Sequence, residues 1–348
     1  METAMAMVFD DSEWILADSI IPEGIDADWV ITDGDEGSVS GVFYHPSAAG
    51  SRRICLSYAS FGRLSPALPD PSLSFLPPAA HARSSSRGLL LLRGPWSAYY
   101  VCNPATAESR RIPLPPRPHH YNPAPPLALV VRPDDPAQFH IVCAIDAGSS
   151  GYRFEIFSSV SGAWKASPVA ASTDPIVPGS GVSAAGVAYW RTSAPAVIAY
   201  DPEAEEARVL LPPPGCKEAD GRWQLGAAGG SGTLCCTCVT RSAVVVYCLG
   251  PSDEWTALGS VPLAIIGGDE AVEWESGDPI PCRELPRPLR FESTNLEVVL
   301  WVDGRVLAVD LETRRVREIR FNGPAPCHDE DYVSYITTAP PVAPVASG

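Results

Sequence analysis

Short apolar strands, each followed by a turn and then by a more polar strand, recur five times along the chain. The turns fall near Asn103, Ser158, Asp201, Gly250 and Asp310, so the repeat length is roughly 40 to 60 residues. A repeat of this length built from short strands is typical of a β-propeller, whose blades each hold about four strands. The pattern predicts an all-β, propeller-like ring of about six to eight four-stranded antiparallel blades.

Individual strands can be placed from their apolar positions. Gly88–Leu92 has four consecutive leucines, which predicts a strand buried on both faces. Leu127–Val131, Phe139–Ile145 and Tyr152–Phe157 follow one another as strands and Trp164 begins a fourth, so one complete blade can be traced. No convincing helical period with caps runs for ten or more residues, so we expect a chain that is nearly all β.

Changes in composition divide the chain. We expect residues 1–60 to be an acidic, strand-rich N-terminal part of the propeller and residues 61–86 to be a Pro/Ser-rich connection. Residues 87–336 form the main propeller and residues 337–348 a disordered, Ala/Pro-rich tail. The proline-rich run 112–126 excludes helix and central strand and predicts an exposed loop.

The acidic net charge of the chain argues against some classes of binding partner. The net charge is −16, and residues 1–50 contain eleven acidic side chains without any Lys or Arg. Phosphates would be repelled, which argues against nonspecific binding to nucleic acid or to an anionic membrane. The acidic segment is either a solubilising face or a surface that steers a basic partner.

The sequence shows no targeting or membrane-spanning segment, which bears on the cellular compartment we expect. Neither a signal peptide nor an apolar run of about 18 residues is present, so we expect a cytoplasmic and/or nuclear protein. The ten cysteines are then expected to be reduced and mostly buried.

Five segments resemble the F-box-associated, kelch-like propeller region of plant F-box proteins. They occur in the family's order within residues 60–320 and are Ser85–Leu92, Tyr100–Thr106, Phe154–Ser159 with Trp164, Gly186–Trp190 and Val197–Pro202. The resemblance implies a noncatalytic protein-interaction module, the substrate-recognition region of a ubiquitin ligase, which binds an unidentified protein target through loops of one propeller face.

The resemblance covers only the recognition half of that family. Before Gly88 there is no Leu-Pro-x-x-Leu helix start of an F-box, which counts against direct binding of a Skp1-type adaptor. The first 60 residues are also similar to β-rich repeats in a family of grass proteins.

A second function class stays open. A propeller enzyme or carbohydrate-binding protein would have its site at the central channel. That hypothesis predicts polar residues converging from several blades, with carboxylates or histidines of shifted pKa.

The run from Cys235 to Cys238 carries three thiols, a ligand type that structural zinc sites use. Such sites need four converging ligands, usually as two spaced pairs, whereas Cys216, Cys248 and Cys282 stand alone in the sequence. Cys236 also points to the opposite strand face from Cys235. We interpret these residues as buried strand cysteines and expect no metal and no cofactor.

Three further motifs lack the context that their chemistry needs. Gly179–Ala184 loosely matches a dinucleotide fingerprint but precedes a strand, where pyrophosphate binding requires a helix. Ser183 and Ser231 are not in a Gly-x-Ser-x-Gly elbow, which argues against a serine hydrolase. The acidic turns at 203–206 and 329–331 lack calcium-loop spacing, and we interpret them as solvated turn charge.

Aromatic residues divide into two groups. Trp164, Trp255 and Trp301 fall inside blade patterns, which predicts packing between blades. Aromatic residues in exposed loops are good anchors for a partner. The partner-binding candidates of this kind are Trp96, His119, His120, Tyr121 and Trp274.

Overall fold

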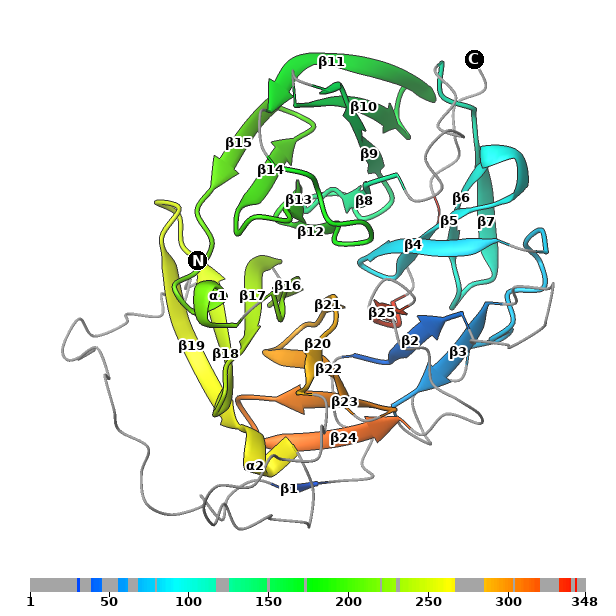
Figure 1. Ribbon diagram of the computed structural model, residues 1–348. Helices are drawn as coiled ribbons and strands as arrows, with labels where there is room; N and C mark the ends of the chain where they lie inside the picture. The colour runs from blue at the N-terminus through cyan, green and yellow to red at the C-terminus, as the bar shows by residue number, and fades with distance from the viewer. Residues whose placement is uncertain are drawn as a thin grey trace, which may run out of the picture.

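The strands form a ring of blades (Figure 1). The computed structural model of the chain describes residues 30–31, 39–45, 56–61, 68–78, 80–116, 125–148, 151–171, 174–219, 221–229, 232–266, 285–302, 304–319, 332–338 and 342. Within these residues the strands make six sheets, so the protein is a six-bladed β-propeller. The predicted fold class is confirmed, with a blade number at the lower end of the expected range.

Blades 2, 3 and 4 are four-stranded antiparallel sheets whose strands follow chain order. Blade 2 contains β4 (His81–Ser86), β5 (Leu89–Arg93), β6 (Tyr99–Asn103) and β7 (Glu108–Ile112), with the 3₁₀ turn η1 (Pro95–Ser97) between β5 and β6. Blade 3 contains β8 (Leu127–Val131), β9 (Phe139–Asp146), β10 (Tyr152–Ser158) and β11 (Ala163–Ala171). Blade 4 contains β12 (Val182–Ala184), β13 (Val187–Arg191), β14 (Val197–Asp201) and β15 (Glu206–Leu210). In each blade the first strand lies nearest to the centre of the ring (Figure 1).

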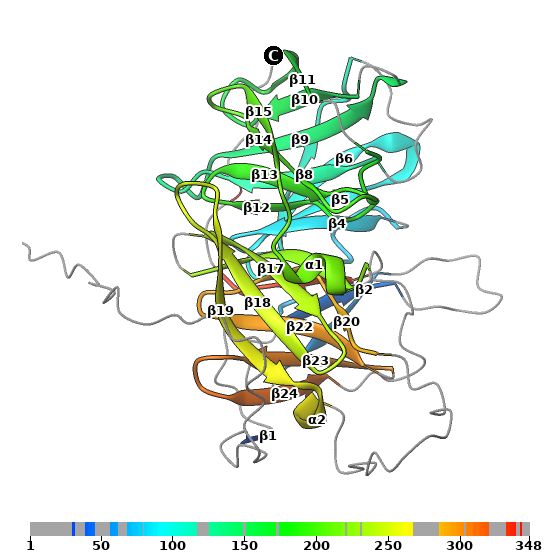
Figure 2. The same ribbon diagram turned by 60° about the vertical axis from the view of Figure 1, so that its left-hand side comes forward.

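Blades 5 and 6 follow the same plan with additions. Blade 5 contains β16 (Trp223–Ala228), β17 (Thr233–Val239), β18 (Ala243–Leu249) and β19 (Trp255–Pro262). Blade 6 contains β20 (Arg287–Pro288), β22 (Glu297–Val302), β23 (Arg305–Asp310) and β24 (Arg315–Ile319). Two short strands pair in parallel at these blades: β21 (Phe291–Glu292) with β16, and β1 (Val30–Ile31) with β24. Figure 2 shows the short helices α1 (Gly215–Glu218), beside β17, and α2 (Leu263–Ile266), after β19.

Blade 1 closes the ring from both ends of the chain. Its inner strand is β25 (Tyr332–Tyr335), which pairs antiparallel with β2 (Gly41–Tyr44), and β2 pairs in turn with β3 (Ser57–Ser60). Closure of this kind pairs strand edges that would otherwise stay open to other chains.

The apolar core lies between neighbouring blades. Leu89 and Leu91 of β5 pack in a cluster with β8 and β9 of blade 3, whereas Leu90 and Leu92 pack in a cluster with β2 and β25 of blade 1. Successive side chains of a strand point to opposite faces of its blade. A strand such as β5, whose blade packs against a neighbour on each face, is therefore apolar at every buried position. The prediction of a strand buried on both faces is therefore confirmed.

Two segments differ from their expectations. Val342, in the tail 337–348 that was expected to be disordered, is buried in the cluster between blades 2 and 3, and its N–H donates to Glu108 Oε2 at 3.0 Å. Residues 61–86 were expected to be a connection, yet their last six residues, His81–Ser86, form the inner strand β4. Ala82, Ser84 and Ser86 are the buried positions of this strand. The serine hydroxyls of β4 make hydrogen bonds with other inner strands, so β4 lacks the apolar run by which β8, also an inner strand, is recognised.

Neither helix in the described part of the chain has the length and apolar character that crossing a membrane requires.

Candidate functional site at the channel mouth

The inner strands of all six blades point their carboxyl ends at one cavity of about 400 Å³. Every inner strand is followed by residues that line it, so these strands run in the same direction. We call this opening the channel mouth and its side of the ring the mouth face, and we call the opposite side the far face. The residues that line the cavity include Ser86, Arg87, Ser183 and Glu292.

Arg290 lies in the channel below the mouth and is only 5% exposed. Its Nη1 donates to the carbonyl oxygens of Arg83 at 2.8 Å and Gly181 at 3.3 Å, and its Nη2 donates to that of Tyr332 at 3.1 Å. These acceptors belong to blade 2, to the segment entering blade 4 and to blade 1. A guanidinium has five N–H donors in a fixed fork, which suits it to acceptors on several strands at once. Arg290 therefore links segments of three other blades by hydrogen bonds.

Serine side chains make further links between inner strands. The hydroxyl of Ser85 donates to the Ser334 carbonyl at 2.6 Å, and that of Ser183 donates to the Ser86 hydroxyl at 2.9 Å. The second bond joins blades 2 and 4, which are not neighbours in the ring. The channel is therefore narrow immediately below its mouth.

Glu292 places a carboxyl group at the mouth. Its Oε1 accepts a hydrogen bond from the backbone N–H of Arg87 at 2.7 Å, and its own N–H donates to the Ser334 hydroxyl at 3.1 Å. Its Oε2 is buried and has no hydrogen-bond partner among the described residues. Burial raises the pKa of Glu292 to about 7, although the Arg87 N–H and guanidinium act to lower it. A carboxyl group with a spare oxygen of this kind is suited to bind a cationic or hydrogen-bond-donating group.

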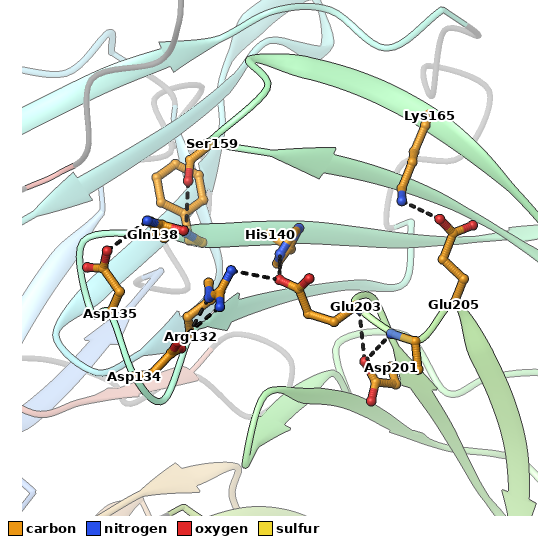
Figure 3. A network of polar contacts seen from close by, with 12 residues as sticks. Arg132, Asp134, Asp135, Gln138, His140, Ser159, Lys165, Asp201, Glu203 and Glu205 are labelled. Carbon is orange, nitrogen blue, oxygen red and sulfur yellow. Dashed lines mark hydrogen bonds and ion pairs between the residues drawn. The ribbon is translucent and has the colours of Figure 1, made fainter.

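A charged network lies on the mouth face between blades 3 and 4 (Figure 3). Glu203 Oε1 is 3.0 Å from His140 Nε2 and 3.3 Å from Arg132 Nη1. Glu205 pairs with Lys165 in the same way. Glu203 is 57% exposed in the turn after β14, as expected for solvated turn charge, and both glutamates also reach side chains of the preceding blade.

The described aromatic candidate, Trp96, lies far from the mouth. The strand β4 ends at the mouth and β5 returns, so the η1 turn that holds Trp96 lies on the far face. Its side chain is 95% exposed and its φ is 59°, a left-handed conformation. His119, His120, Tyr121 and Trp274 lie outside the described residues. The structure therefore places one of the five candidates, and the grouping of all five stays a prediction.

Two of the blade tryptophans join outer strands of neighbouring blades. The indole N–H of Trp164 donates to the Pro113 carbonyl at 2.7 Å, and that of Trp255 donates to the Leu211 carbonyl at 2.8 Å. Pro113 and Leu211 each lie just past the outer strand of the preceding blade. Trp301 packs against an apolar cluster that spans blades 5, 6 and 1. The prediction of packing between blades agrees with these contacts.

The cysteine interpretation changes in one respect. Cys235 and Cys236 do face different apolar clusters, as expected for neighbours on a strand. Cys216, which stands alone in the sequence, lies against Cys236 and Cys238 in the structure. Hydrogen bonds from its two thiol neighbours lower the pKa of Cys238.

Sequence reasoning missed Arg290, Glu292 and the position of Cys216. The signal for Arg290 was a charged residue between Leu289 and Phe291 in a segment that showed no regular strand pattern. Nothing in the sequence indicates which inner strands meet it. The last three residues of the Gly179–Ala184 motif form the strand β12, so the glycines open a strand, as expected, and not a helix.

Comparison with known proteins adds family information. The family model for "F-box protein At3g26010-like, beta-propeller" matches residues 70–270. The F-box protein At5g03970 of Arabidopsis thaliana is 25% identical over 259 residues. That alignment covers 69% of this chain and 59% of the relative, so the chain spans little more than half of that protein.

Solved structures are similar only at a distance. TolB from Acinetobacter baumannii is 12% identical, with a TM-score of 0.37 over 64% of this chain and 51% of that chain. The complex of KlAtg21 with the coiled coil of AgAtg16 is 12% identical, with a TM-score of 0.40 over 84% of this chain and 80% of that chain. Likenesses at this level carry no argument about function.

Proposed function

Since this chain belongs to the family of F-box protein At3g26010-like β-propellers, we propose that it is a noncatalytic protein-interaction module that holds its target at the channel mouth. The observation that carries the proposal is the cavity of about 400 Å³, to which every blade contributes and at which Glu292 places a buried carboxyl group. Sites of this size, with few polar groups among small and apolar residues, are typical of binding pockets.

The chemistry of the mouth selects a basic group on the target. Glu292 Oε2 is buried and lacks a hydrogen-bond partner among the described residues, so a lysine or arginine side chain would satisfy it. The net charge of −16 supports the same choice, because it attracts a basic partner over a distance.

Catalysis is the less favoured alternative. Acid–base chemistry needs a second positioned proton donor or acceptor near the first. Among the described lining residues Glu292 is the one acidic group, Arg87 is the one basic group, and histidine is absent. Polar residues do converge from several blades, but hydrogen bonds to neighbouring strands occupy Arg290 and Ser85.

Membership of this family supports a proposal for the cellular role of the module. We propose that the module recognises substrates for a ubiquitin ligase and works in the cytoplasm or nucleus. The similarity to an Arabidopsis F-box protein supports this proposal, although the chain covers only 59% of that relative.

Capture experiments with matched variants test the site. Wild-type protein, Glu292→Gln and Glu312→Gln are immobilised and exposed to plant extract. Glu312 is an exposed residue in the turn after β23, so its variant makes the same substitution on the same face away from the mouth. We expect the wild type and Glu312→Gln to recover the same protein and Glu292→Gln to lose it.

The pH dependence and a far-face variant complete the test. Ion pairing needs the ionised carboxylate, and a pKa of about 7 leaves roughly nine-tenths of Glu292 ionised at pH 8 and about one-tenth at pH 6. Apparent affinity should therefore fall about tenfold between pH 8 and pH 6. Capture that survives Glu292→Gln but is lost with Trp96→Ala would move the binding surface to the far face and overturn the proposal.

A further inference from the structure

Three cysteine thiols meet where blades 4 and 5 pack together. Cys236 and Cys238 lie on β17, and Cys216 lies in α1, which connects the two blades. The Sγ atom of Cys216 is 3.7 Å from that of Cys236 and 3.3 Å from that of Cys238, and the remaining Sγ–Sγ distance is 3.8 Å. All three side chains are fully buried.

Local structure explains why these thiols converge. Cys236 and Cys238 are two residues apart on a strand and so project from the same face. Helix α1 lies close above this face because it begins at a glycine. A Cβ on Gly215 would be 2.8 Å from the hydroxyl oxygen of Tyr247, too close for any other residue without movement.

The spacing of the sulfur atoms matches that of a metal site. Zinc–sulfur bonds of about 2.3 Å in a tetrahedron place sulfur atoms about 3.8 Å apart. The observed separations of 3.3 to 3.8 Å differ from this value by at most about half an ångström. An ion would fit on the three sulfur atoms with little movement of β17 or α1.

We propose that Cys216, Cys236 and Cys238 form a binding site for a soft, thiol-binding metal ion of the Zn²⁺ or Cu⁺ type. Thiolates select such ions over hard cations. Each thiol that binds loses its proton to solvent, so a fully thiolate-bound ion releases three protons. Arg191, whose guanidinium lies over the Trp223 ring and donates to the Gly221 carbonyl, supplies positive charge beside Cys216.

The ion would act as a structural link. Cys216 lies in the connection between blades, whereas the other two ligands lie within blade 5, so binding would fix the connection to the blade that follows it. Metal bound only by the folded chain stabilises that chain.

Spectroscopic titration tests the site with the metal alone. The full-length reduced protein, freed of metal by a chelator, is titrated with Co²⁺ as a probe for Zn²⁺ and with Cu⁺ under anaerobic conditions. We expect thiolate-to-metal charge-transfer absorption that saturates at one ion per chain with at least one of the two ions. Cys216→Ala, Cys236→Ala and Cys238→Ala should each weaken binding at least tenfold.

Cys235→Ala is the matched control. Cys235 is the neighbour of Cys236, is equally buried and faces the other core cluster, so its variant should bind the ion like the wild type. X-ray absorption spectroscopy is measured on the metal-loaded wild type, so its result does not depend on whether any variant folds. It should show three sulfur neighbours at about 2.3 Å for zinc.

Two results would overturn the proposal. One is a metal shell of nitrogen and oxygen only, or charge-transfer absorption that persists in all three alanine variants. The other is reduced protein that binds neither ion, together with a Cys216–Cys238 disulfide on air oxidation, which would make the cluster a redox pair.

Discussion

Replacing Glu292 with glutamine should stabilise the protein more at pH 8 than at pH 5. The glutamine side chain would keep an oxygen that accepts the hydrogen bond from the Arg87 backbone N–H, but it cannot ionise. In the wild type the carboxyl group has a pKa raised from 4.5 to about 7, because burial disfavours its charged form. The folded state therefore binds a proton more tightly than the unfolded state does.

The sign and size follow from proton linkage. A folded-state pKa above the unfolded value gives stability that is fully present below about pH 4.5 and is lost as the pH rises through 7. Between pH 5 and pH 8 the loss attributable to Glu292 is on the order of 2 to 3 kcal/mol, because each pKa unit corresponds to about 1.4 kcal/mol. The variant has no such loss.

Urea unfolding at the two pH values measures this difference. Glutamine also places an amide NH₂ where Oε2 lies, and this has the same cost at both pH values. The cost cancels when the change in unfolding free energy caused by the substitution at pH 5 is subtracted from the change at pH 8. Glu312→Gln provides the control for an exposed glutamate. If the change in unfolding free energy caused by Glu292→Gln differs by less than about 0.5 kcal/mol between pH 5 and pH 8, the claim that folding buries this carboxyl group and favours its neutral form is refuted.

Three further substitutions are tested by urea unfolding: Trp164 and Arg290 make contacts between blades, whereas Arg317 pairs with Glu297 within blade 6. Trp164→Phe should cost about 1 kcal/mol, because it removes the indole hydrogen bond to the Pro113 carbonyl, and an unchanged unfolding free energy would contradict this. Arg290→Met should cost about 3 kcal/mol, because it removes the buried hydrogen bonds that the guanidinium donates to the carbonyl oxygens of Arg83, Gly181 and Tyr332; a cost below about 1 kcal/mol would mean that water replaces the guanidinium. Arg317→Met should cost about 3 to 5 kcal/mol, because it leaves the buried carboxylate of Glu297 without its cation, and the loss should be smaller when Glu297 is also replaced by leucine. Equal losses for the single and double variants would show that the ion pair is not the source of the cost.

Much of the fold could be predicted from local pattern. The four leucines of β5 are apolar at every position, and they are buried against blades on both sides. Trp164 begins the outer strand predicted for blade 3 and packs against the preceding blade as expected. Local signals failed at β4, whose Arg83-Ser84-Ser85-Ser86 sequence resembles a loop because its neighbours at the channel are other inner strands.

The site was beyond such reasoning. Arg290 finds its acceptors in three other parts of the ring, and Glu292 is held by Arg87, 205 residues away. Cys216 lies 22 residues from Cys238, with a strand between them. In each case the partner is determined by how blades close around the channel, and none of these pairings has a local period.

The amino-acid order alone determined where strands and turns lie, because alternation of side chains along a strand and the backbone preferences of turn residues act over a few positions. It thereby determined a repeating all-β chain with apolar strand faces. Only the tertiary structure decided that the ring has six blades, that β25 completes the blade begun by β2, and which buried polar and thiol groups meet. These outcomes depend on closing the ring, where groups from distant segments must satisfy one another's hydrogen bonds and charges.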